Sequence, residues 1–371
     1  MRGKAFFLLT LIASVAQAQP GNTAGKRILA SALEMVNGVA YYKNQPYTGT
    51  AFSFWDNKQI NTETSYRDGL KDGEYREYTE EHVLYTMETW QEGYKNGPYE
   101  YHDPEGHLQS RGTFFHDQLD GVIEGFYPNG FLRYRNTYYR GIRQGESFTW
   151  HKNGAPEQKS FFVNDLPDGE VLAWYPDSSL RYVADYKMGV RNGRYYRYHR
   201  SGCPAEESYF KSGKTDSIRR LWNEQNCNPL AVEEYLAGEK HGTFIQFDFS
   251  GDTLQLEQWS RGKRDGMFKQ WSVVTEPVKV RVKGTDRKVT LFSQQRGIET
   301  EGTYSDGEPD GYWIYGQISH MQMREGTYDH GVMTGEWKFY DKDGDLLMKQ
   351  KFSDEGDLLK EKHYRKPKRK K

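Results

Sequence analysis

A glycine recurs every 24 residues through most of this chain, and this period constrains the fold more than any other feature. The interval is 24 from the first to the seventh of these glycines; Ser217 fills the next slot, and later intervals include one of 25 and one of 45. A fixed period of 20–50 residues indicates a repeat array. We call these residues the opening glycines: Gly49, Gly73, Gly97, Gly121, Gly145, Gly169, Gly193, Gly242, Gly266, Gly311 and Gly335.

Each repeat contains two turn signals. Gly or Asp stands four residues before most opening glycines, as at Gly141 and Asp165, and tolerates the positive φ of a tight reversal. An Asn-Gly type of turn follows the opening glycine, as at Asn129-Gly130. Two reversals in 24 residues leave two short strands. The sequence therefore predicts an all-β fold, an elongated single-layer antiparallel β-meander of about twelve 24-residue hairpin repeats.

Two columns of aromatic residues recur with the same period as the glycines. One column stands five places after the opening glycine and includes Trp150, Trp174, Tyr198 and Trp222; the other closes each repeat, as at Tyr138 and Phe162. A single-layer sheet has no second layer to bury a face against. We therefore expect stacked rings from neighbouring hairpins to supply the burial, which agrees with 15% aromatic residues in a chain that is only 36% hydrophobic.

The repeat resembles the MORN repeat in its bacterial variant form, over about residues 33–356. The matching segments are GEYREYTE from Gly73, GPYEYHDPEGHL from Gly97 and GEWKFYDKDGDL from Gly335. The resemblance implies a β-hairpin array and a role in protein assembly. It implies no activity, because enzymes with such repeats carry a separate catalytic domain.

The two ends of the chain differ from the array. Residues 1–18 are typical of a secretory signal peptide, with Arg2 and Lys4 before an apolar run and an Ala16-Gln17-Ala18 cleavage site; an uncleaved anchor is the alternative. We expect a flexible leader over 19–32, a short hairpin capping the first sheet edge over 33–48, the array over 33–359 and a basic disordered tail over 360–371. No other segment is apolar enough to span a membrane. The expected localisation is therefore exported: periplasmic, outer-surface or secreted.

The only two cysteines, Cys203 and Cys227, lie 24 residues apart beside neighbouring hairpin tips. In an exported chain they are candidates for a disulfide. Equivalent strand positions in successive hairpins are about 10 Å apart, too far for a bridge, but tips are less constrained than strands. We favour a disulfide over two free buried thiols.

The 45-residue interval contains an insertion at about 272–300. Its alternation of Val with Lys279, Arg281 and Lys283 predicts a long hairpin with one basic face. This arm is either solvated or a docking finger for a partner or an anionic surface.

Charge is unevenly distributed. The tail holds eight Lys or Arg and one Glu, whereas the whole chain carries −1, so the array is acidic. The tail either binds an anionic envelope surface or simply solubilises the chain. Nucleic acid is a poor candidate partner for an exported, acidic array.

The sequence predicts no catalytic, cofactor-binding or metal site. It contains no H-E-x-x-H, G-x-S-x-G or P-loop motif. The run Asp341, Asp343 and Asp345 has the wrong offset for a calcium loop.

We therefore predict a non-enzymatic protein-interaction scaffold of the cell envelope with an unidentified protein partner. The alternative is a glycan-binding surface protein that uses the row Trp150, Trp174, Tyr198 and Trp222, because aromatic rings stack on sugars. The competing interpretation of that row is packing between hairpins.

Overall fold

A computed structural model describes residues 25–281, 288–318 and 323–364. It divides the chain into two compact units, the first ending at Asp120 and the second beginning at Gly121. The expected signal peptide (1–18), the start of the leader, Lys283 and the end of the basic tail lie outside the described residues. Among the residues that the structure does describe, no helix is long and apolar enough to cross a membrane.

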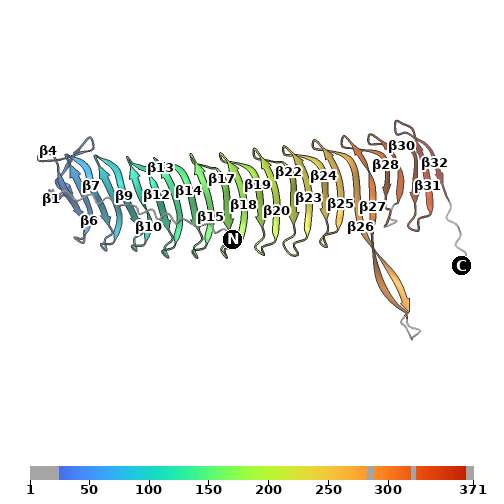
Figure 1. The fold of residues 1–371 in the computed structure, drawn as a ribbon, viewed down its shortest axis with the longest axis horizontal. Coiled ribbons are helices and arrows are strands. Elements are labelled where there is room, and N and C mark those ends of the chain that lie inside the picture. Colours follow the sequence, from blue (N-terminus) through green and yellow to red (C-terminus); the bar gives the residue numbers. More distant parts are fainter. Residues whose placement is uncertain (1–24, 282–287, 319–322, 365–371) are drawn as a thin grey trace, which may run out of the picture. The chain divides into compact units, whose positions relative to one another are not determined.

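Unit one is an antiparallel meander that is closed at its first edge by one parallel strand (Figure 1). Strand β1 (Lys26–Leu29) pairs with β5 in parallel, and antiparallel pairing then continues in chain order. The remaining strands of this sheet are β5 (Gly49–Phe54), β6 (Ile60–Arg67), β7 (Leu70–Tyr78), β8 (Leu84–Gln91), β9 (Tyr94–His102), β10 (Leu108–Phe115) and β11 (Gln118–Leu119).

The first edge differs from the expectation. Residues 26–32, expected as part of a flexible leader, form β1 and the short 3-10 helix η1 (Ala30–Ala32). The expected capping hairpin is instead a separate three-stranded sheet of β2 (Glu34–Val36), β3 (Val39–Tyr42) and β4 (Gln45–Pro46). Tyr47, only 4% exposed, fixes β1 in place because its hydroxyl donates to the carbonyl of Lys26. Thus β1, and not the hairpin, covers the open edge of β5.

Unit two repeats the same hairpin in chain order, with strands lying side by side from β12 to β32 (Figure 1). Its ladders are antiparallel throughout, so the predicted all-β antiparallel meander is confirmed. Strand β32 also crosses the expected boundary at residue 359. The strands are β12 (Gly121–Phe126), β13 (Leu132–Tyr139), β14 (Ile142–Trp150), β15 (Pro156–Val163), β16 (Leu166–Pro167), β17 (Gly169–Trp174), β18 (Leu180–Lys187), β19 (Val190–Tyr198), β20 (Pro204–Lys211), β21 (Lys214–Thr215), β22 (Ser217–Trp222), β23 (Pro229–Leu236), β24 (Glu239–Phe247), β25 (Thr253–Ser260), β26 (Lys263–Arg281), β27 (Lys288–Ser305), β28 (Glu308–Tyr315), β29 (Arg324–Asp329), β30 (Val332–Tyr340), β31 (Leu346–Phe352) and β32 (Leu358–His363).

The opening glycine is required by backbone conformation. Gly193 has φ of +126°, and Ser217, which fills the same slot one repeat later, has φ of +70°. Only glycine adopts positive φ at no steric cost. The Ser217 repeat therefore has a strained backbone where the others have none.

The two faces of unit two differ in packing. Side chains alternate between faces along a strand, and the registers place the buried rings Phe162, Tyr195, Phe244, Trp313 and Trp337 on one face. We call this the packed face, and its opposite the open face. Four of the five follow an opening glycine by two places, and Phe162 closes its repeat.

Rings on the packed face contact one another across repeats. Phe244 lies 5.4 Å from Tyr235 and 5.8 Å from Trp259, measured between ring centroids. Trp313 likewise contacts Phe268 at 5.6 Å and Tyr304 at 5.0 Å. Such pairs stabilise beyond the area they bury. They are the hydrophobic core of a sheet without a second layer.

A row of cations completes this core, and the sequence reasoning missed it. Lys or Arg stands two places before six opening glycines, and each lies over aromatic rings: those of the packed face in unit two, and Tyr75 and Trp90 in unit one. Arg143 lies 3.9 Å from the ring centroid of Phe162, and Lys240 lies 4.3 Å from that of Trp259. Burial lowers the pKa of the Lys71 ammonium in unit one. The row consists of Lys71, Lys95, Arg143, Arg191, Lys240 and Arg264.

Candidate functional site: the ring row of the open face

The four predicted binding residues Trp150, Trp174, Tyr198 and Trp222 come to lie on the open face, at the ends of β14, β17, β19 and β22. We call them the ring row. At each of these ring residues the register with the next strand of the hairpin shifts by one residue, which is a β-bulge. All four side chains are half-buried. The structure therefore aligns all four on one face, one ring per hairpin.

The row is not part of the ring-to-ring packing. Among the described residues, no ring contact joins one member of the row to another; Trp150 stacks only on Phe148 of its own strand, at 5.8 Å. Rings on the packed face do contact across repeats, as Tyr182 does with Tyr195 and Tyr235 with Phe244. The ring-to-ring stacking expected for this column is therefore not found between these four described residues, because an intervening strand separates them, although all four side chains are half-buried.

The backbone beneath the row is held by a ladder of side-chain hydrogen bonds. The carbonyl of each ring residue is reached by a side chain of the preceding repeat, from the position that lies 23 residues earlier. Tyr127 donates to the carbonyl of Trp150 at 2.8 Å, and Tyr175 donates to that of Tyr198 at 2.9 Å.

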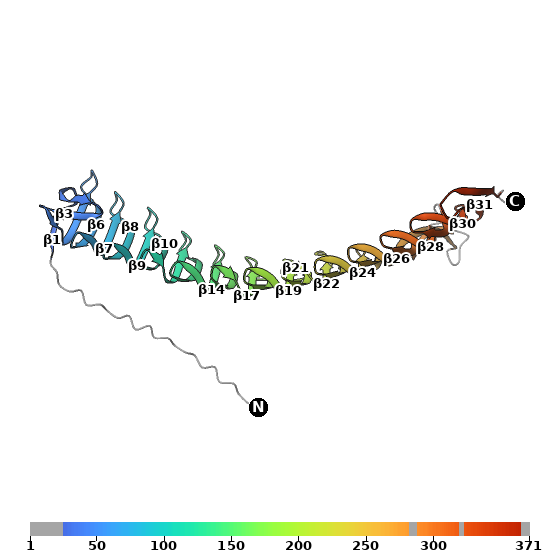
Figure 2. The ribbon, with the colours of Figure 1, turned by 90° about the horizontal axis from the view of Figure 1, so that it is seen from above.

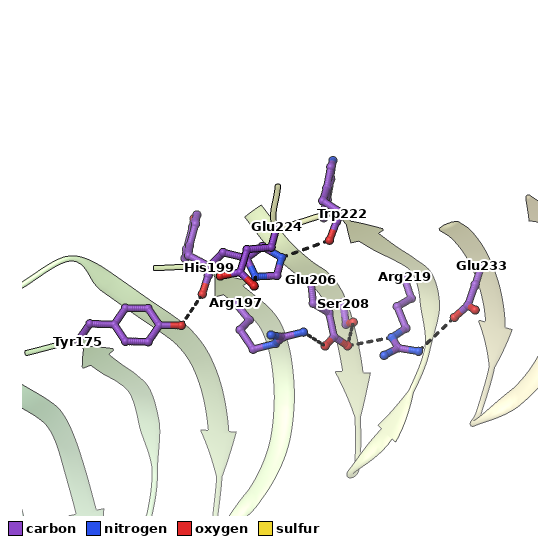
Figure 3. A network of polar contacts seen from close by, with 10 residues as sticks. Tyr175, Arg197, His199, Glu206, Ser208, Arg219, Trp222, Glu224 and Glu233 are labelled. Atoms are coloured by element: carbon purple, nitrogen blue, oxygen red, sulfur yellow. Dashed lines mark hydrogen bonds and ion pairs between the residues drawn. The ribbon is translucent and has the colours of Figure 1, made fainter. Parts of the chain in front are cut away.

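Histidines fill the alternate steps of this ladder. The Nε2 atom of His151 lies 3.1 Å from the carbonyl of Trp174, and that of His199 lies 3.2 Å from the carbonyl of Trp222 (Figure 3). A carbonyl oxygen only accepts, so both imidazoles carry a proton on Nε2. The ladder fixes each ring position relative to the preceding repeat.

Polar side chains flank the row at the hairpin tips. Asn153 donates from Nδ2 to the carbonyl of Pro176 at 2.7 Å, and Arg200 donates to Asp177 at 3.0 Å. The hydroxyl and backbone N–H of Ser179, with a smaller contribution from Arg200, lower the pKa of Asp177 to about 2. The tips thus place planar amide, guanidinium and carboxylate groups beside half-buried rings.

The packed face beneath the same repeats carries a charge network that the sequence did not reveal. Arg219 occupies the position that Tyr195 and Phe244 hold in neighbouring repeats, and it pairs with Glu206 at 2.8 Å and Glu233 at 3.2 Å (Figure 3). Burial is the largest single influence on the pKa of Arg219 and lowers it, but the hydrogen bonds and negative charges of Glu206 and Glu233 together raise that pKa above its usual value. The Ser217 repeat therefore replaces a core ring with ion pairs.

The two cysteines meet between the tip of this repeat, which holds Cys227, and the tip of the preceding repeat, which holds Cys203. The structure joins Cys203 to Cys227 by a disulfide, with Cα atoms 5.6 Å apart. Cys227 has φ of +57°, in a loop one residue longer than its neighbours. This loop brings the Cα atoms closer than equivalent strand positions.

The basic arm is formed by the extensions of β26 and β27, which run past the ends of the neighbouring strands (Figure 1). Its ladder extends from Ser272 opposite Gly297 to Arg281 opposite Lys288. Arg296 anchors the base of the arm through ion pairs to Asp248 at 2.5 Å and Asp252 at 3.6 Å. Lys279 and Arg281 lie in this ladder, away from the ring row.

The acidic groups lie in turns. Oδ1 of Asp341 accepts the backbone N–H of Asp343 and of Asp345, both at 2.9 Å, which is an Asx-type turn at a hairpin tip. Asp310, Asp329 and His330 also place ligand atoms within 4.8 Å of one another, but Asp329 and His330 are exposed. These groups serve turn geometry.

The surface of the described residues has open, solvent-accessible hollows. A hollow of about 570 Å³ in unit two is lined by charged residues of the turns between repeats, including His241, Lys263 and Asp306. Lys263 and Asp306 pair across it at 2.7 Å. Its polar lining suits water better than an apolar ligand.

The family model of the MORN repeat variant matches residues 333–354, which cover most of β30 and β31. The predicted resemblance is confirmed for this hairpin. No curated protein matches the sequence. The crystal structure of TcdB2-TccC3 without hypervariable C-terminal region is 12% identical over 88% of this chain and 16% of that chain, with a TM-score of 0.16. This chain thus spans about 16% of that protein's length, and so low a TM-score carries no argument.

Proposed function

We propose that this chain, which carries a MORN-type repeat, is a non-enzymatic protein-interaction scaffold of the cell envelope. One observation carries the proposal. The open face of unit two exposes apolar side chains beside five of its opening glycines, each 42–52% exposed. We call this the turn-side row: Val122, Phe161, Tyr209, Met267 and Tyr312.

The composition of this row suits a protein interface. Aromatic residues and methionine are enriched at interface cores, where large rings supply contact area at little entropic cost. Charged residues sit directly opposite the rings, with Glu146 facing Phe161 and Arg194 facing Tyr209 in the ladders. Arg194 in turn pairs with Asp185 at 3.0 Å. Rings bordered by fixed charges give a partner both contact area and register.

The envelope location follows from the expected signal peptide and the basic tail. Export would leave a mature chain that begins at Gln19, and the tail would attract an anionic envelope surface. Mass spectrometry of the protein recovered from its native cells tests export. A chain that begins at Met1 or lacks only Met1 contradicts it.

Site-specific photo-crosslinking tests the scaffold. A photoreactive phenylalanine at Phe161, Tyr209 or Tyr312 is expected to capture the same discrete protein in native cells. The same group at Ser201, on an exposed hairpin tip, is the matched control. Equal capture from Ser201, or none from the three row positions, contradicts the proposal.

A further inference from the structure

We propose that the ring row binds an extended β-1,4-linked glycan strand, with one aromatic ring stacked on every second sugar. This goes beyond the protein scaffold, since it concerns a different row, a different ligand class and a separate test. Three observations carry it: the row's period, its freedom from core packing, and its polar surroundings.

The period of the row matches the period of such a glycan. Consecutive members are two strands apart, which corresponds to about 10 Å in a sheet. In an extended β-1,4-linked chain alternate sugars are turned over, so every second sugar presents the same face in the same direction. One ring on every second sugar therefore requires a glycan whose two-sugar repeat is as long as the distance between two rings, about 10 Å.

The four rings are half-buried, so each keeps part of its surface open to solvent. The core rings lie on the packed face and contact one another, whereas Trp150, Trp174, Tyr198 and Trp222 have no ring contact with one another. The face of an aromatic ring is electrically negative, so it attracts the positively polarised C–H groups on the flat face of a pyranose. The Tyr and His ladder holds their backbone in place, so little ordering is needed on binding.

The tips supply groups for sugar hydroxyls. Asp177 is held ionised by Ser179 and Arg200, and Asn153 lies one repeat earlier beside the same row. Planar polar side chains next to rings fix the orientation of a ligand that the rings alone would let slide. A protein partner without internal repeats would not contact the same kind of ring at the same interval four times. A repeating polymer presents the same group at a fixed interval and can contact all four rings.

Co-sedimentation of the full chain with insoluble polymers tests the proposal. The probes are chitin, purified peptidoglycan sacculi and cellulose, which share β-1,4 linkage, with α-linked insoluble starch as the contrasting polymer. We expect binding to at least one β-1,4 polymer and not to starch. The polymer that is bound identifies the source of the ligand. Chitin and sacculi carry acetamido groups, whereas cellulose carries none, so binding to chitin and sacculi alone would show that the site requires the acetamido group.

Matched variants locate the site. Trp174→Ala with Trp222→Ala is expected to weaken binding at least about tenfold, by analogy with ring stacking on bases, whereas Trp174→Phe retains most of it. The control, Phe161→Ala with Tyr209→Ala, removes two more exposed rings from the same face and should leave binding unchanged. Circular dichroism confirms that each variant folds.

Several results would overturn the inference: no binding to any β-1,4 polymer, equal binding to starch, equal loss in the control, or a row that captures only protein. Failure here leaves the scaffold intact, because the photo-crosslinking positions lie in the turn-side row. Failure of the scaffold likewise leaves glycan binding to be measured on the isolated chain.

Discussion

The indole of Trp337 lies over the α-carbon of Gly326 on the neighbouring strand, in the space that a β-carbon would occupy. Its Nε1 donates to the carbonyl of Thr327 at 3.1 Å, and Trp337 has no exposed surface. The same arrangement joins Trp313 to Gly302, with Nε1 donating to the carbonyl of Thr303 at 3.0 Å. A missing side chain on one strand thus makes room for the core ring of the next.

Adding a single methyl group should therefore destabilise the array. Gly326→Ala is expected to lower the free energy of unfolding by about 1–3 kcal/mol, because the indole must leave its place. Urea unfolding measures the loss. In a Trp337→Val background the penalty should shrink, since the colliding ring is gone. An equal penalty in both backgrounds would show that the glycine is needed for another reason.

The cation row predicts a second effect on stability. Lys240→Met keeps the aliphatic stem but removes a charge that lies 4.3 Å from the Trp259 centroid and 4.9 Å from that of Phe244. We expect a loss of about 0.5–2 kcal/mol in urea unfolding. Lys211→Met, at an exposed position, is the control. If the free energy of unfolding falls by the same amount in both variants, the cause is the change in net charge and not the contact with the rings.

The disulfide predicts a mass difference and a stability difference. Unreduced protein should be lighter than reduced protein by two hydrogens. Replacing Cys203 and Cys227 together by Ser should cost about 2–4 kcal/mol, because the cross-link restricts the unfolded chain. It also braces the repeat that has Ser217 in a strained conformation and Arg219 in place of a core ring. Identical masses before and after reduction would exclude the bridge.

The Asp177 carboxylate predicts a pH effect. Its pKa of about 2 is lower than the usual 3.8 chiefly because Ser179 donates to it, so Ser179→Ala should raise that pKa. Since the folded pKa is the lower one, the stabilisation is present above the unfolded pKa and disappears as pH falls from about 4 to about 2. Carboxyl NMR titration measures the shift. An unchanged pKa in Ser179→Ala would assign the effect to Arg200.

Periodicity predicted the hairpins because each opening glycine, such as Gly193, needs a backbone conformation that few residues adopt. It could not assign faces, because a column of rings at one spacing looks the same whether it is packed or open. Register decides this: it places Tyr195 on the packed face and Tyr198 on the open face. The Lys and Arg before the opening glycines were visible in the sequence, but their ring partners depend on cross-strand register.

The side-chain ladder beneath the ring row yields the last prediction. Tyr175→Phe removes the donor that lies 2.9 Å from the carbonyl of Tyr198, and should cost about 0.5–1.5 kcal/mol. Tyr196→Phe is the matched control, because the Tyr196 hydroxyl has no hydrogen bond to any described residue. Urea unfolding of the two variants gives the difference, and hydrogen exchange at the Tyr198 to Trp222 tips locates it. A loss in Tyr196→Phe equal to that in Tyr175→Phe would mean that the hydroxyl acts through solvation, and that the ladder does not link one repeat to the next.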